Sequence, residues 1–169
     1  MSQIDHTAYP QREALQPGQI IPAFALPGPD GMPHSPWDYK QREHLLLLLL
    51  RSSKNSETRG ILRTFASRYA DFREEQCALL AITPDTVIRN LEAQDALHLP
   101  FALLADPKGT VIARYTDSDT ATHTLSPSIV LADRYGALYQ QWIVEEEAQL
   151  PPIETLLESL AYLNRLCTP

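Results

Sequence analysis

Six consecutive leucines, Leu45-Leu46-Leu47-Leu48-Leu49-Leu50, form the longest apolar run of the chain. Periodicity alone cannot assign this run, because a buried strand and a buried helix segment are both apolar throughout. The run is short and lies between turn-forming residues, and a central strand of a parallel sheet is apolar on both faces. We therefore predict a central strand over residues 45–50.

The segments that follow the leucine run alternate between helical and extended patterns. Apolar residues at helical spacing predict an amphipathic helix that includes Ile61 to Phe72. A second apolar run at 77–82 predicts a second strand, and residues 101–104 form a short strand or turn before a short helix near residue 112. The helix between these strands is expected to have its inner face at Val87, Ile88, Leu91 and Leu97.

The C-terminal third is predicted to be a hairpin followed by a helix. Residues 128–132 and 137–143 flank a bend that contains Gly136, and leucines at helical spacing occupy 153–166. The resulting order is strand, helix, strand, helix, short strand or turn, helix, hairpin, helix. This order predicts an α/β fold of the thioredoxin-like plan, with three layers and a central mixed β-sheet that has helices on both faces.

The N-terminal region is polar and rich in turn formers. Residues 1–16 are predicted to be an arm, and residues 17–169 a single domain. Within that domain, the turn signals between residues 18 and 40 predict a short N-terminal hairpin extension.

Composition excludes several classes of protein. A chain of 169 residues with 44% hydrophobic content can bury a core without disulfides or a metal. The net charge is −7 and lysine and arginine form no cluster, so we expect no nucleic-acid partner. No apolar run approaches the roughly 20 residues that span a bilayer, no signal peptide is recognisable, and only two cysteines occur. We expect a cytoplasmic protein without a membrane partner.

The five histidines form no pair with metal-ligand spacing, so neither a metal nor a cofactor is expected.

Three segments resemble the peroxiredoxins, the alkyl hydroperoxide reductase and thiol-specific antioxidant branch of the thioredoxin-like proteins. They are Pro17–Leu26, Leu99–Val111, which starts with Leu-Pro-Phe, and Pro127–Asp133 with Gly136. The resemblance covers roughly residues 17 to 165 and implies a redoxin with antioxidant, oxidoreductase activity. It also implies, by analogy alone, that a homodimer is plausible.

The reactive loop departs from the family pattern. Anchoring on Phe65 puts Thr58 at the peroxidatic cysteine position, Asn55 at the family threonine position and Arg51 at its proline position. No cysteine lies between Met1 and Gln76, so the Cys-x-x-Cys motif is absent as well. The stretch at 125–127 lacks the arginine that activates the thiol in many relatives.

This departure implies that the ordinary peroxidase cycle is lost, because a threonine hydroxyl has no sulfenic-acid state. We expect Thr58 to make local hydrogen bonds at a helix start. The acidic run Glu145-Glu146-Glu147 is expected to be a solvated linker with charge at the following helix start. The first hypothesis is a non-catalytic protein that binds a protein partner or a small ligand in a remnant pocket formed by Arg51, Asn55, Thr58 and Pro127.

The second hypothesis is a thiol-dependent oxidoreductase that reduces peroxide with Cys77 or Cys167. Cys77 precedes a predicted core strand, where a free cysteine behaves as a small hydrophobe. Cys167 lies near the C-terminus, and the sequence does not tell whether the two thiols can pair. Whether the bond before Pro127 is cis is also left open.

Overall fold

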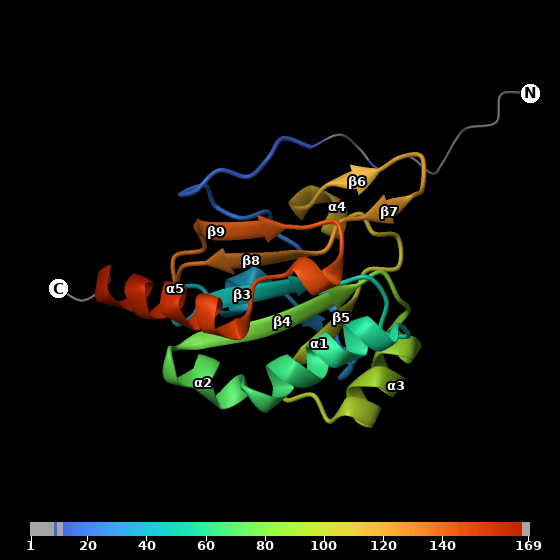
Figure 1. Cartoon of the computed structure of the whole chain (residues 1–169), viewed down its shortest axis with the longest axis horizontal. Helices are drawn as coiled ribbons and strands as arrows, with labels where there is room; N and C mark the ends of the chain where they lie inside the picture. Colours follow the sequence, from blue (N-terminus) through green and yellow to red (C-terminus); the bar gives the residue numbers. More distant parts are fainter. Residues whose placement is uncertain (1–8, 10–11, 167–169) are drawn as a thin grey trace, which may run out of the picture.

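A five-stranded mixed sheet with the order β5-β4-β3-β8-β9 runs through the middle of the molecule (Figure 1). The computed structural model describes residue 9 and residues 12–166. Strand β3 is parallel to β4 and antiparallel to β8, β4 is parallel to β5, and β8 is antiparallel to β9. The strands are β3 (His44–Leu49), β4 (Cys77–Thr83), β5 (Ala102–Ala105), β8 (Ser128–Ala132) and β9 (Leu138–Ile143). The predicted thioredoxin-like α/β fold is confirmed.

The leucine run divides two hydrophobic cores. Side chains alternate across a strand, so Leu46, Leu48 and Leu50 enter one core, while Leu45, Leu47 and Leu49 enter the other. All six leucines are buried. A helix would have aimed these side chains around its whole circumference, whereas a strand between two neighbours buries every one of them. The prediction of a central strand is therefore confirmed.

Helices cover both faces of this sheet. The core that contains Leu46 is closed by α1 (Ser56–Ser67), α2 (Tyr69–Glu74), α3 (Val87–Leu97) and α5 (Ile153–Leu166) (Figure 1). The other core is closed by α4 (Ile112–Tyr115) and by the N-terminal segment through Ile21, Phe24 and Leu26.

The helix expected through Phe72 is broken at Arg68, which separates α1 from α2. The Arg68 guanidinium donates to Asp71 at 2.6 Å and to Glu154 of α5 at 2.8 Å, which holds this residue at the break.

The inner face predicted for α3 is wrong in part. Ile88 and Leu91 are 72% and 38% exposed, whereas Asn90 and Ala93 are buried. Polar side chains of α3 point inward because they bind backbone groups of the edge strand β5 and of the residues that precede it. The amide of Asn90 donates to the Leu104 carbonyl, and a single side chain, Gln94, bonds to the backbone of Leu99, Phe101 and Leu103. β5 is an edge strand, and these bonds provide partners for backbone groups on the side of β5 that faces away from β4.

Small elements complete the chain. The predicted N-terminal hairpin is the pair β1 (Leu26–Pro27) and β2 (Pro33–His34), followed by η1 (Pro36–Asp38). A second ribbon, β6 (Ser118–Asp119) with β7 (Thr124–Leu125), was not expected, and η2 (Glu147–Gln149) lies between β9 and α5. In the described part of the chain, no helix is long and apolar enough to cross a membrane.

A buried polar cluster anchors α5 to the start of β3. The Asn164 amide nitrogen donates to the Glu75 carbonyl and carboxylate, so its oxygen accepts from Nε2 of His44 at 2.8 Å. His44 is fully buried, and its Nδ1 has no hydrogen-bond partner among the described residues. Burial lowers the pKa of His44 below its ordinary value, although the Asn164 hydrogen bond opposes that shift.

Acidification is therefore expected to destabilise the fold through His44. The imidazole of His44 binds a proton near pH 6.5 in the unfolded state and only at lower pH in the folded state. The contribution of neutral His44 to the free energy of unfolding is therefore fully present above pH 6.5, and it is lost as the pH falls through the pKa of the folded state. The limiting slope is about 1.4 kcal/mol per pH unit. Urea unfolding at a series of pH values between 7 and 5 should show a steeper loss for the unmodified protein than for His44→Gln. Identical slopes would contradict this assignment.

Candidate functional site

A pocket of about 210 Å³ opens at the carboxyl ends of β3 and β4. Ligand sites of α/β folds commonly lie at this edge of the sheet, since loops and helix starts meet there. Leu50, Arg51 and Ser52 leave β3 at the pocket, and Pro84 leaves β4 beside them. The lining residues are Tyr9, Leu49, Leu50, Arg51, Ser52, Pro84, Ile112, His123, Thr124, Leu125 and Ser126.

One wall of this pocket depends on a glycine. A Cβ atom at Gly109 would lie 2.8 Å from the Tyr9 hydroxyl and 3.0 Å from the Leu125 side chain. Gly109 also has a φ of +67°, which side-chain-bearing residues rarely adopt. The glycine thus lets Tyr9, which precedes the first strand in the sequence, approach Leu125 of β7 and line the pocket with it.

A buried carboxylate holds the loop behind the pocket. Glu147 of η2 is 3% exposed, and it accepts the Arg51 backbone N–H at 2.7 Å. The hydroxyl of Thr58, in the first turn of α1, lies 2.9 and 2.8 Å from the two Glu147 carboxylate oxygens. The Arg51 side chain donates through Nη2 to the Glu145 carbonyl at 2.5 Å. These bonds join three segments that are far apart in the sequence.

A second carboxylate, Asp85, fixes the other side of the same loop. It accepts the Ser53 backbone N–H at 2.7 Å and the Ser52 hydroxyl at 2.9 Å. Burial opposes ionisation of Asp85, but these donors together hold its pKa below the ordinary value. Asp85 thus orders the loop by accepting hydrogen bonds from Ser52 and Ser53.

Of the four residues predicted to form the remnant pocket, the structure brings Arg51 and Thr58 together on Glu147, but only Arg51 lines the pocket. Asn55 is exposed at the start of α1. Thr58 is buried, and its hydroxyl bonds to a residue distant in sequence instead of to the local helix start. Pro127 is buried behind Ser126, and the peptide bond before it is trans.

The comparisons with known proteins identify the family. Residues 17–143 match the model of the AhpC/TSA family. The chain belongs to the AhpC/TSA family. A peroxiredoxin of Aeropyrum pernix is 29% identical over 83 residues, which are 44% of this chain and 33% of that protein. The chain therefore matches about a third of that relative's length.

Solved structures agree on the fold. AhpC of Enterococcus faecalis has a TM-score of 0.80 at 15% identity, covering 90% of this chain and 94% of its own. The peroxidoxin BcpB of Mycobacterium tuberculosis has a TM-score of 0.76 at 17% identity, covering 88% of this chain and 98% of its own. At such identities the likeness establishes a peroxiredoxin fold and no more.

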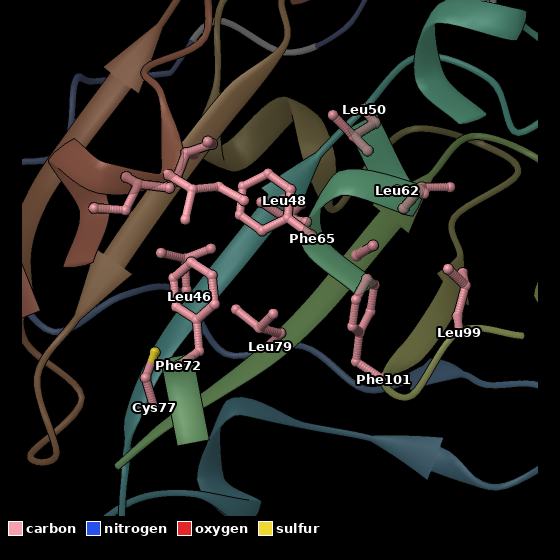
Figure 2. Close-up of a cluster of buried hydrophobic side chains, with 14 of the residues drawn as sticks. Leu46, Leu48, Leu50, Leu62, Phe65, Phe72, Cys77, Leu79, Leu99 and Phe101 are labelled. Atoms are coloured by element: carbon pink, nitrogen blue, oxygen red, sulfur yellow. The ribbon is translucent and has the colours of Figure 1, made fainter. Parts of the chain in front are cut away.

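Cys77 lies far from the pocket of this AhpC/TSA protein. It is the first residue of β4 and pairs with His44, the first residue of β3, whereas the pocket lies at the opposite ends of these parallel strands. Arg51 lies seven positions after His44, which corresponds to roughly 20 Å of extended chain. Figure 2 shows the Cys77 side chain among the apolar residues of one core, close to Phe72. Burial raises the pKa of this thiol strongly, and Cys167 lies outside the described residues.

The pocket thus contains no thiol among its described lining residues. Within residues 9 and 12–166, no three histidine, cysteine or acidic side chains gather as a metal site. The lining of the pocket combines apolar side chains with hydroxyl groups and one arginine, and this combination suits the binding of an amphiphilic molecule.

Glu147, Asp85 and Tyr9 were missed by the sequence analysis. The expectation that all of residues 145–147 form a solvated linker is corrected, because Glu147 is buried while Glu145 and Glu146 are exposed. No local pattern separates these three acidic residues. Asp85 carried a usable signal, since it lies three positions after the carboxyl end of the strand predicted at 77–82.

Replacing Thr58 by valine is expected to lower the free energy of unfolding by about 1–3 kcal/mol, because a buried carboxylate loses a donor. Thr58→Ser keeps the hydroxyl and should lose less. Urea unfolding measures both, with Thr64→Val as control, since Thr64 is exposed on the same helix. Equal losses in the valine and serine variants would contradict the role of the hydroxyl.

Proposed function

We propose that this AhpC/TSA protein is not a peroxidase and that it binds a small ligand or a protein partner at the face formed by residues 51–58 and 123–127. The observation that carries this proposal is the contact between the Thr58 hydroxyl and the buried Glu147 carboxylate. We place Thr58 at the position of the peroxidatic cysteine, since it lies in the first turn of the helix after β3 and precedes the buried Phe65 by seven residues.

Peroxide reduction of the family type needs a thiolate. Its sulfur attacks the O–O bond, the alcohol or water leaves with a proton, and the sulfur is oxidised to a sulfenic acid. Positive charge or a helix N-terminus favours the thiolate. Position 58 has no sulfur, and the carboxylate that it faces at hydrogen-bond distance opposes the effect of the helix N-terminus on a thiolate.

The described thiol is a poor substitute. Cys77 is fully buried at the opposite end of the sheet, and its raised pKa disfavours the thiolate. A thiol-dependent oxidoreductase that uses Cys77 or Cys167 stays an alternative prediction, as do a homodimer and a cytoplasmic location.

Peroxide turnover separates these functions. With dithiothreitol or a thioredoxin system as reductant, the unmodified protein is expected to reduce hydrogen peroxide and organic hydroperoxides no faster than Cys77→Ala/Cys167→Ser. Circular dichroism of both proteins controls for folding. Turnover that disappears when either cysteine alone is replaced would establish a relocated catalytic thiol and overturn the proposal.

The electrostatic argument has its own test in the same cysteine-free background. Thr58→Cys should introduce a thiol whose pKa exceeds the ordinary value of about 8.5, because Glu147 disfavours the thiolate. Adding Glu147→Gln should lower that pKa by about one unit or more. The pH dependence of thiolate ultraviolet absorbance reports the pKa, and Glu145→Gln removes an exposed charge as the matched control. The same thiol pKa in all three proteins would contradict the placement of position 58 beside Glu147.

A further inference from the structure

The chemistry of the pocket lining is asymmetric. Leu49, Leu50, Pro84, Ile112 and Leu125 give it an apolar floor and wall, while Ser52, Thr124 and Ser126 supply hydroxyl groups. A volume of 210 Å³ corresponds to about seven water molecules. The site is therefore large enough for a small organic molecule. Its apolar lining offers water few hydrogen-bond partners.

Arg51 is the fixed positive charge of this lining. Its backbone is held by Glu147 and its Nη2 by the Glu145 carbonyl, so the side chain is positioned by the fold. Within the described part of the chain, no carboxylate forms an ion pair with Arg51, and Nη1 has no acceptor. A guanidinium without a carboxylate beside an apolar pocket can bind an anionic group from a ligand.

The neighbouring carboxylates do not compete for that role. None of the described lining residues is acidic. Glu147 accepts from Thr58 and from the Arg51 backbone, while Asp85 accepts from Ser52 and Ser53. The lining also includes Tyr9 and His123, neither of which has a carboxylate.

We propose that this pocket binds small monocarboxylates with an apolar tail, the carboxylate at Arg51 and the tail against Leu49, Ile112 and Leu125. This inference rests on the proposed binding function and specifies its ligand class. The volume limits the tail to about five to seven carbons. A neutral ligand of the same shape would fill the apolar part and leave the guanidinium without its partner.

Titration of the ¹⁵N-labelled full-length protein with hexanoate and with hexanamide tests this ligand class. Hexanoate is expected to shift the backbone amides of Leu50, Ser52 and Ser126, and to bind at least about tenfold more tightly than hexanamide. Arg51→Gln should abolish that preference, whereas Arg63→Gln, which removes an exposed arginine outside the pocket, should preserve it. The inference is overturned if pocket amides do not shift, if the two ligands bind equally, or if both arginine variants behave alike.

A second variant guards against misfolding at position 51. Thr124 is exposed at the pocket, so Thr124→Glu adds a negative charge without disturbing the core. It should weaken hexanoate binding at least about tenfold more than it weakens hexanamide binding, because only hexanoate carries a charge that the new carboxylate repels. An unchanged hexanoate affinity would count against a carboxylate in this pocket. Loss of the carboxylate preference leaves the peroxide assay unaffected, whereas cysteine-dependent turnover would refute the proposed function whether or not hexanoate binds.

Discussion

The pairing of β3 with β4 on one side and β8 on the other is the constraint on which the other elements depend. It buries a leucine run from both faces, so each face requires a layer that removes those side chains from water. α1, α2, α3 and α5 supply one layer, and α4 with the N-terminal segment supplies the other. The same pairing sets the site, because the loop that leaves β3 has to cross the edge of the sheet before α1 begins.

The loop that follows β3 is held in place by two acidic side chains, Glu147 and Asp85. Glu147 and Asp85 together accept three hydrogen bonds from the backbone of Arg51, the hydroxyl of Ser52 and the backbone of Ser53. In a thiol peroxidase the corresponding region has to stabilise a sulfur anion, and anionic carboxylates there would oppose it. The loop of this AhpC/TSA protein is thus organised around negative charge that is internal to the protein, and Arg51 is the positively charged residue among the described pocket lining.

Much of the fold was accessible from the sequence, because periodicity reports burial. The helix over 153–166 was located by leucines at helical spacing, whereas the leucine run was assigned to a strand by its short length and flanking turns, and the hairpin by the bend that contains Gly136. Periodicity failed at α3, where Asn90 and Gln94 face inward to bind backbone groups of β5, an arrangement that a hydrophobic pattern cannot reveal. The site was less accessible, since Glu147 reaches Thr58 across 89 positions and looks like its acidic neighbours in sequence. Arg51 was found because the family resemblance located the loop.

Tyr9 lines the pocket although it precedes the segment that matches the family model, residues 17–143. Tyr9 and Leu125 form a wall of the pocket next to Gly109, and neither residue belongs to the five-stranded sheet. Under the proposed binding function, a substitution of Tyr9 would change the wall of the pocket and leave the central sheet as it is, so one architecture could acquire different binding specificities.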